Sequence, residues 1–188
     1  RELAGELQLD QVAQYNHGAA LFAMAALRED GRKGMLVDHP GEEWALPFPP
    51  FPVPGGIILP ALSDAQARFN LNSLVTGGSV NQSALFFFRR LLSQLLLPPE
   101  LADSLVDWLD ADSQPFSSAG AEDDYYLRLA VPYRSANRPL STFDELRLVR
   151  GYNRDSLRAL SSYVTVLPTA ATKMNVNFIS PGILEALV

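Results

Sequence analysis

The sequence predicts an α+β protein in which one long N-terminal helix and a β-hairpin precede a largely helical block. Apolar residues recur at helical spacing from Arg1 to Leu27, alternate with polar residues from Ala67 to Asn72, and return to helical spacing after Thr76. The 188 residues, 47% of them hydrophobic, are enough for one large globular domain or two small ones.

Residues 1–27 are expected to form a single helix with a narrow apolar stripe. Its charged residues all precede Gln11, so the second half is nearly uncharged and is expected to pack on both flanks. Asp30-Gly31 then predicts the end of the helix. The pattern fits an amphipathic helix laid on a core, and it also fits the continuation of a helix that begins before Arg1. The stripe consists of Leu3, Leu7, Val12, Tyr15, Ala19, Phe22 and Ala26.

The segment from Gly34 to Gly56 carries five prolines between residues 47 and 54. Proline fixes φ and lacks the N–H donor, so a helix and a central strand are both excluded and an extended, polyproline-like path is expected. Trp44, Phe48 and Phe51 would anchor this path as a stiff strap. The alternative interpretation is a PxxP ligand for a recognition domain.

A β-hairpin is expected from residues 57–59 and 67–72, joined through Ser63-Asp64. In the second run the apolar residues would face a core and the polar residues would face outward. Asn70 and Asn72 flank a leucine of the buried face, and their side chains are expected to bond to loop backbone.

After Thr76-Gly77-Gly78 the periodicity predicts a series of helices. The longest covers residues 81–97 and is stopped by Pro98-Pro99, and the second of these prolines suits the first turn of the next helix. Thr142 and Glu145 have the spacing of a capping box. Further helices are expected over residues 142–150, over 153–160 and from Ser180-Pro181 onward, with a β-prone run at 163–167.

Six carboxylates crowd the stretch from Asp107 to Tyr126, and they repel one another unless a cation, basic side chains or N–H donors neutralise them. Hard oxygen ligands on a loop are what Ca²⁺ needs, although the spacing is not that of an EF-hand loop. Helix caps and solvated loop carboxylates would explain the same pattern. Asp110 with Glu122 could also form the carboxylate pair of a hydrolase. The six are Asp107, Asp110, Asp112, Glu122, Asp123 and Asp124.

Composition argues against several classes of function. A net charge of −6 disfavours nucleic acid as a partner. The lack of cysteine excludes disulfides, thiolate metal sites and a cysteine nucleophile. His17 and His39 have no second ligand at zinc spacing. Residues 175–187 look like the entry to a helix-hairpin-helix unit, so a nucleic-acid module remains an alternative, although Lys173 is the only basic residue nearby.

A set of short motifs runs through nearly the whole chain. It comprises Glu43-Trp44-Ala45, Asp64 with Arg68-Phe69-Asn70-Leu71-Asn72, Asp107-Trp108-Leu109-Asp110-Ala111-Asp112, Gly120-Ala121-Glu122-Asp123 with Tyr126, Asn137-Arg138-Pro139, Glu145-Leu146 with Val149 and Gly151, and Leu167-Pro168 with Asn175-Val176-Asn177. In this order the motifs resemble one family, the minor pseudopilin K of bacterial type II secretion, also called general secretion pathway protein K. The combination is specific, although no single motif is.

The resemblance implies a pilin-like fold, with a long N-terminal helix packed on a small antiparallel sheet and a large, mostly α-helical domain inserted between strands. Residues 1–76 would form the pilin-like helix and hairpin, and residues 77–188 the inserted domain. A membrane-spanning segment would precede Arg1, and the last sheet strands would follow Val188. The chain would then be the periplasmic domain of an inner-membrane-anchored protein of a Gram-negative bacterium.

The resemblance also implies a non-enzymatic role. The family member caps the tip of a periplasmic pseudopilus together with the minor pseudopilins I and J, helps to start its assembly, and is a candidate to contact exported substrates. Its helical domain binds calcium, which we carry onto Asp110, Asp112, Glu122 and Asp123. The uncharged face of the N-terminal helix is expected to bind the partner subunits through Val12, Tyr15, Ala19, Phe22 and Ala26. The alternatives are the calcium-dependent hydrolase and the nucleic-acid module introduced above.

Overall fold

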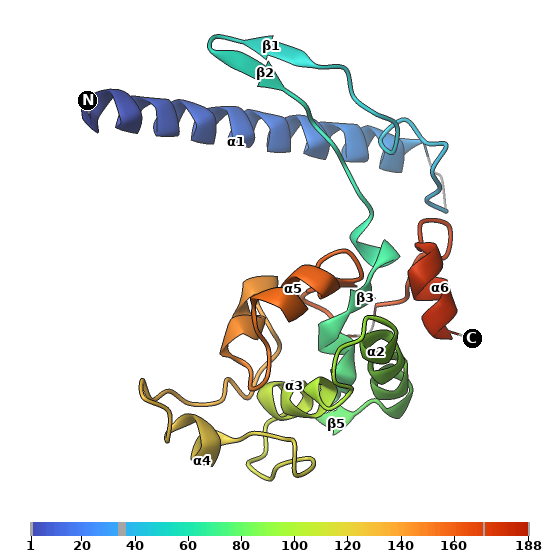
Figure 1. Cartoon of the computed structure of the whole chain (residues 1–188). Coiled ribbons are helices and arrows are strands. Elements are labelled where there is room, and N and C mark those ends of the chain that lie inside the picture. The colour runs from blue at the N-terminus through green and yellow to red at the C-terminus, as the bar shows by residue number, and fades with distance from the viewer. Residues whose placement is uncertain (1, 34–36, 171, 188) are drawn as a thin grey trace. The chain divides into compact units, whose positions relative to one another are not determined.

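The computed structural model describes residues 2–33, 37–170 and 172–187, and the chain divides into two compact units, Arg1–Asp64 and Ala65–Val188. We call them the N-terminal unit and the C-terminal unit; they are coloured blue to cyan and green to red in Figure 1. The content is α+β, with helices beside short strands that pair in twos. Residues 65–76, which the sequence analysis grouped with the N-terminal helix, lie in the C-terminal unit because Phe69, Leu71 and Leu74 belong to its core.

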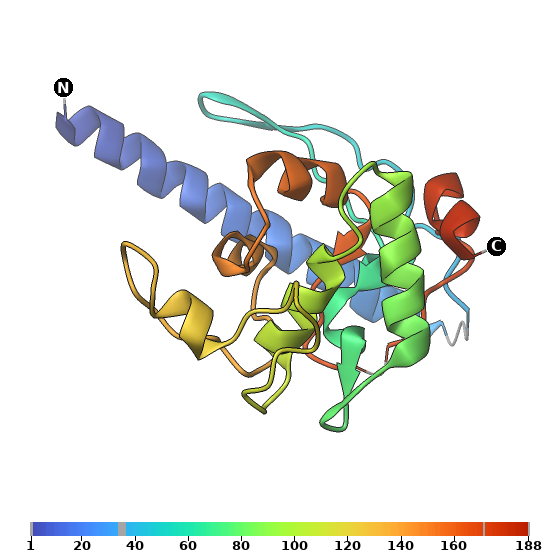
Figure 2. The same ribbon diagram turned by 60° about the horizontal axis from the view of Figure 1, so that its bottom comes forward.

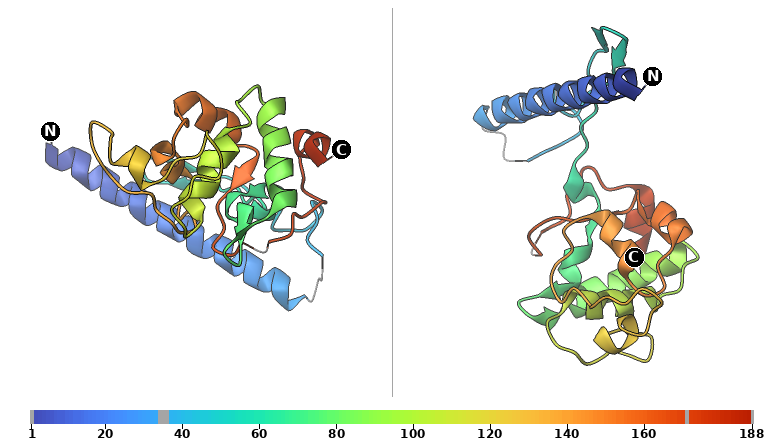
Figure 3. Two further views of the ribbon diagram at one scale, coloured as in Figure 1. Left: turned by 90° about the horizontal axis from the view of Figure 1, so that it is seen from below. Right: turned by 90° about the vertical axis from the view of Figure 1, so that its left-hand side faces the viewer.

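The N-terminal unit is built on helix α1 (Glu2–Arg32), a continuous rod in every view (Figures 1 and 3). The helix continues past the end that Asp30-Gly31 predicted. The N–H of Lys33 still donates to the carbonyl oxygens of Glu29 (3.3 Å) and Asp30 (2.9 Å), so this glycine lies within the last turn and does not end the helix.

The hairpin of this unit forms within the proline-rich segment. Strands β1 (Phe51–Val53) and β2 (Gly56–Ile58) pair antiparallel around a turn in which Gly55 has φ +89°. The predicted pairing of residues 57–59 with 67–72 is therefore wrong. A two-stranded sheet consists only of edge strands, where proline is tolerated, so the prolines did not prevent a hairpin here.

The C-terminal unit confirms most of the predicted helices. Asn81 caps α2 (Gln82–Gln94), and Asn153 closes a complete capping box on α5 (Arg154–Leu160). Helix α6 runs alongside α2 (Figure 2). The other elements are 3₁₀ helices η1 (Ala65–Ala67), η2 (Leu71–Leu74) and η3 (Phe143–Leu148), helices α3 (Leu101–Leu109), α4 (Asp123–Tyr126) and α6 (Pro181–Leu187), and strands β3 (Phe69–Asn70), β4 (Val75–Thr76), β5 (Ser79–Val80) and β6 (Val164–Thr165).

Two local expectations about this unit are corrected by the structure. Thr142 makes no side-chain cap and η3 is a 3₁₀ helix, because the Glu145 carboxylate is used elsewhere: it accepts from the Trp108 indole N–H (3.2 Å) and from the backbone N–H of Ser141 (2.9 Å). Strand β3 pairs in parallel with β6, while β4 and β5 form a separate antiparallel pair.

The core of the C-terminal unit surrounds α3, all nine residues of which are buried. Asn72 ties this core to two distant loops: its amide donates to the carbonyl oxygens of Leu140 (3.1 Å) and Leu167 (2.9 Å), and its Oδ1 accepts from the N–H of Leu140 (2.8 Å). Asn70 likewise accepts from the N–H of Leu167 (3.1 Å). The expectation that both asparagines bond to loop backbone is confirmed.

Candidate functional site

The acidic stretch becomes a compact carboxylate cluster where α3 ends and α4 begins. Asp110 is the C-terminal cap residue of α3, Asp112 follows in the loop, and Glu122 is the residue before the first turn of α4. One carboxylate oxygen from each of these three residues lies within 4.8 Å of the other two. We call these three residues the acidic cluster.

The acidic cluster lacks the hydrogen bonds that buried carboxylates need. Asp110 Oδ1 and both carboxylate oxygens of Glu122 are buried and have no hydrogen-bond partner among the residues that the structure describes. An unpaired buried polar group costs on the order of 1–3 kcal/mol, and more when it is charged. These three oxygens therefore point to a positively charged ligand that compensates them.

The pKa values of Asp110 and Glu122 also indicate that these carboxylates lack a compensating positive charge. Burial, followed by the charges of Asp112 and Asp107, raises the pKa of Asp110 to about 6. Burial, followed by the charges of Asp107, Asp110, Asp112 and Asp123, raises the pKa of Glu122 to about 7. In both residues the protein disfavours the anion, and a bound cation would reverse that preference.

Asp107 lies beside the cluster, and its buried Oδ2 likewise has no hydrogen-bond partner among the described residues. Its Oδ1 accepts the backbone N–H of Phe116 (2.8 Å), which folds the loop back onto α3. A Cβ at Gly120 would collide with Asp107 Oδ2, so only glycine fits there. The loop therefore depends on glycine to bring Glu122 back to the end of α3.

The structure does not bring Asp123 into the acidic cluster. Its carboxylate accepts from the Arg134 guanidinium and from the backbone N–H of Ser135 (2.9 Å). Asp124 is exposed, at 3.7 Å from Arg128. Of the four residues predicted to ligate a metal, the structure thus places Asp110, Asp112 and Glu122 together and pairs Asp123 with an arginine.

The geometry of the acidic cluster fits a hard divalent cation. Oxygens that bind one Ca²⁺ at about 2.4 Å can lie at most about 4.8 Å apart, and this limit is met here. The arrangement gives no support to a sugar-binding platform, because Trp108 is only 2% exposed and its ring packs edge-on against Tyr126.

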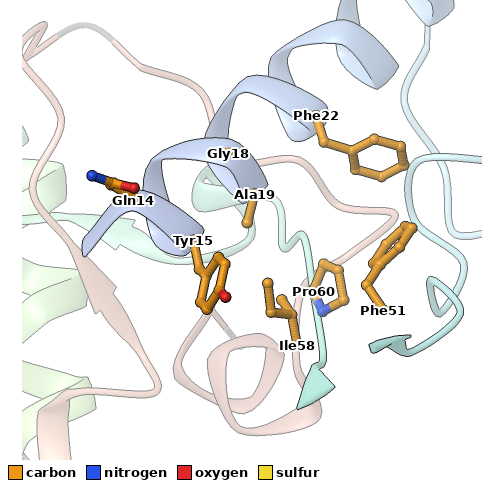
Figure 4. Close-up of a pocket in the computed structure, with 8 residues that line it drawn as sticks. All are labelled: Gln14, Tyr15, Gly18, Ala19, Phe22, Phe51, Ile58 and Pro60. Carbon is orange, nitrogen blue, oxygen red and sulfur yellow. The ribbon is translucent and has the colours of Figure 1, made fainter. Parts of the chain in front are cut away.

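A second feature lies in the N-terminal unit, where α1 and the β1–β2 hairpin enclose an apolar cavity of about 230 Å³. Tyr15, Ala19 and Phe22 line it from the helix, opposite Phe51, Ile58 and Pro60 (Figure 4). The Phe22 ring meets those of Phe48 and Phe51 edge-on, with centroids 5.2 and 5.5 Å apart.

This cavity accounts for part of the predicted partner-binding stripe. Tyr15, Ala19 and Phe22 face the chain's own hairpin, while Val12 is 53% exposed and Ala26 is half-buried. Other faces of α1 expose further apolar side chains, namely Leu21 (52%), Met24 (56%) and Leu27 (46%). The sequence analysis did not single out these three, although the absence of Asp, Glu, Lys and Arg between Gln11 and Leu27 marked their region.

Comparison with known proteins identifies the family. The model of the family described as "Type II secretion system (T2SS), protein K" matches residues 67–169, more than half of the chain. The chain belongs to the type II secretion system protein K family.

Protein K of Pseudomonas aeruginosa is 41% identical over an alignment that covers 100% of this chain and 59% of that protein. Protein K of Pectobacterium carotovorum is 38% identical, with 91% of this chain and 55% of that protein covered. The chain therefore spans less than two thirds of the length of these relatives. Along the helices that the structure describes, no segment is both long enough and apolar enough to cross a bilayer.

A solved structure also resembles this protein K chain along its whole length. It is the crystal structure of the GspK-GspI-GspJ complex from the type 2 secretion system of enterotoxigenic Escherichia coli, which matches with a TM-score of 0.88 and 31% identity over 100% of this chain and 69% of that chain. The matched proteins are named as components of a secretion system, and nothing in these matches supports the hydrolase alternative for Asp110 and Glu122.

Proposed function

We propose that this chain is the periplasmic part of a minor pseudopilin K that assembles with the minor pseudopilins I and J at the tip of the type II secretion pseudopilus. The observation that carries the proposal is the match, over the full length of the chain, to a structure of the GspK-GspI-GspJ complex. We extend the proposal, on the family resemblance, to a Gram-negative periplasm and to an inner-membrane anchor upstream of Arg1. Contact with exported substrates remains a prediction.

We further propose a pilin-like arrangement for the complete protein, in which α1 packs on an antiparallel sheet that begins with β1 and β2. The support is the hairpin against the helix and the edge-on packing of Phe22 on Phe48 and Phe51. The predicted division into residues 1–76 and 77–188 then shifts to the boundary after Asp64, and the C-terminal unit becomes the inserted helical head. A bulky head on a pilin-type helix would block the addition of another subunit above it.

Within this proposal, the partner subunits bind exposed apolar residues of α1. Leu21, Met24 and Leu27 supply exposed apolar surface on faces of α1 other than the one that carries the predicted residues Val12, Tyr15, Ala19, Phe22 and Ala26. Burying a leucine or methionine side chain contributes about 1.5–3 kcal/mol, enough for two or three such residues to decide whether a complex forms.

The test is co-purification with the two partner pseudopilins. We expect Leu21→Glu together with Met24→Glu to weaken complex formation by at least about 100-fold, because each buries a charge in an apolar contact. Val131→Glu is the matched control, since Val131 is an exposed apolar residue of the C-terminal unit (78%). A double variant that keeps its circular dichroism spectrum and still binds like wild type would contradict the proposal.

We also propose that the acidic cluster binds calcium, with Asp110, Asp112 and Glu122 as protein ligands and Asp123 holding the neighbouring Arg134. The unpaired buried oxygens of Asp110 and Glu122 support this. Bound calcium would remove the repulsion among the carboxylates and fix the loop between α3 and α4, which orders a long irregular segment of the head.

A further inference from the structure

A second group of carboxylates lies in the N-terminal unit, where α1 ends. It consists of Asp30 in the last turn of α1, Asp38 in the following loop, and Glu42 in the turn before Trp44. One carboxylate oxygen of each lies within 4.8 Å of the other two, the same limit that the acidic cluster meets. Three carboxylates at this separation repel one another, and a cation bound between them would remove that repulsion.

Glu42 distinguishes this group from an ordinary acidic surface. Glu42 is only 5% exposed. Its Oε2 accepts hydrogen bonds from the indole N–H of Trp44 (2.8 Å) and from the backbone N–H of His39 (3.0 Å). Its Oε1 is buried and has no hydrogen-bond partner in the parts of the chain that the structure describes. The carboxylate is therefore fixed in orientation, with one oxygen left uncompensated.

Two basic side chains at the described end of α1 and the following residue are paired with carboxylates other than Glu42. Lys33 Nζ is bound to Glu43 Oε2 at 2.7 Å, and Arg32 pairs with Glu29 at 3.4 Å. His39 Nδ1 accepts the N–H of Gly41 at 3.1 Å. Burial and the charges of Glu42, Asp64 and Asp30 raise the pKa of Asp38, and the charge of His39 partly offsets this effect.

We propose that Asp30, Asp38 and Glu42 bind a divalent metal ion, calcium by the chemistry of its ligands, at the C-terminal end of α1. All three ligands are hard oxygens, and two of them come from an irregular segment, which suits the flexible coordination of Ca²⁺ better than the strict octahedron of Mg²⁺. The ion would fasten the loop that carries Trp44 to the last turn of α1. This site is separate in sequence and in unit from the acidic cluster, so either can exist without the other.

The experiment is a titration of the full chain with Ca²⁺ alone after treatment with EDTA, using competition with a fluorescent chelator to count sites. We expect Asp38→Asn and Glu42→Gln each to weaken one class of site by at least about 10-fold. Glutamine keeps an oxygen that can accept from Trp44, and Asp38 is exposed, so both variants are expected to fold. Asp110→Asn should leave this class of site unchanged, which separates the inference from the proposal for the C-terminal unit.

Glu43→Gln is the matched control. It removes a neighbouring carboxylate that pairs with Lys33 and is not one of the three proposed ligands. Hydrogen exchange gives a second readout: Ca²⁺ should slow exchange of the backbone amides in residues 37–46 of wild type, and not in Glu42→Gln. Calcium binding that is identical in wild type, Asp38→Asn and Glu42→Gln would overturn the proposal. An equal loss in Glu43→Gln would overturn it as well, since it would show general charge screening.

Discussion

The buried carboxylates of the C-terminal unit differ in the hydrogen-bond donors that surround them. Glu122 and Asp110 are buried with oxygens that find no hydrogen-bond donor in the described parts of the chain, whereas Asp103, equally buried, accepts from Arg89 at 2.6 Å and from the Ser117 hydroxyl at 2.7 Å. Arginine and hydroxyl donors stabilise a buried carboxylate within the chain itself. The unpaired oxygens of the acidic cluster have no such donors among the described residues, which is why we propose calcium as the compensating charge.

Stability without metal should fall as pH rises through the range of these raised pKa values. A folded-state pKa above the unfolded value means that the folded protein holds more protons, so the free energy of unfolding decreases from about pH 4 and levels off above about pH 7. We expect a loss on the order of 2 kcal/mol, measured as thermal melting in EDTA at pH 5 and pH 7.5.

Two further measurements separate the cluster from other titrating groups. Glu122→Gln in EDTA should remove most of the decrease, because the uncharged amide has no proton to lose. Ca²⁺ should also raise the melting temperature of wild type at pH 7.5. At a Ca²⁺ concentration one hundred times the dissociation constant, the free energy of unfolding should increase by about 2.7 kcal/mol. Equal melting curves in EDTA and Ca²⁺ would remove the calcium assignment.

At the scale of elements, the sequence predicted the helices whose bounds are determined by residues close together in the chain. Helices α2, α3 and α5 were predicted because apolar spacing, an asparagine cap and a stopping proline all lie within or beside the helix itself. The pairing of β3 with β6 could not be predicted, because Phe69 and Val164 are far apart in the sequence and each strand has only two residues.

In the candidate site too, some residues are marked by the local sequence and others are brought together only by the fold. Local acidity marked the stretch that contains Asp110, Asp112 and Glu122, and the family resemblance assigned them to calcium. Asp123 lies outside the cluster because it pairs with Arg134 of a separate loop. Glu42 was missed because Asp30, Asp38 and Glu42 come from a helix end and a loop with no recognisable spacing motif.

The cap of α5 allows a direct test of this local reasoning. Asn153 Oδ1 accepts the backbone N–H groups of Asp155 and Ser156, both at 2.9 Å. We expect Asn153→Ala to lower the free energy of unfolding by about 1 kcal/mol, measured by urea denaturation, since both helix N–H groups lose their acceptor. Asn153→Ser, which keeps an acceptor, should change stability by only a few tenths of that amount; an equal loss would show that the cap is not the cause.

At the scale of the whole molecule, the hydrophobic core belongs to one unit. All of its buried members lie between Phe69 and Ala186, whereas Trp44 is the one buried hydrophobic residue among residues 10–33 and 37–64. Cooperative unfolding requires such a core. The N-terminal unit therefore has little to stabilise it on its own.

We expect residues 65–188 expressed alone to fold, to unfold in one cooperative transition, and to keep the response of the acidic cluster to calcium. Residues 1–64 alone should show no cooperative transition. Calorimetry of the two fragments beside the full chain measures both. A C-terminal fragment without a heat-absorption peak would show that its core needs the N-terminal unit.

The two outer edges of the β1–β2 hairpin differ in the backbone groups that they offer to a further strand. In a hairpin closed by a two-residue turn, the middle residues of the two strands, here Pro52 and Ile57, direct their backbone groups away from each other. Pro52 has no N–H to offer, so the outer side of β1 is blunted, while Ile57 leaves a full donor and acceptor on the outer side of β2. An additional strand would therefore find a complete set of partners beside β2, and proline at position 52 disfavours pairing on the opposite side.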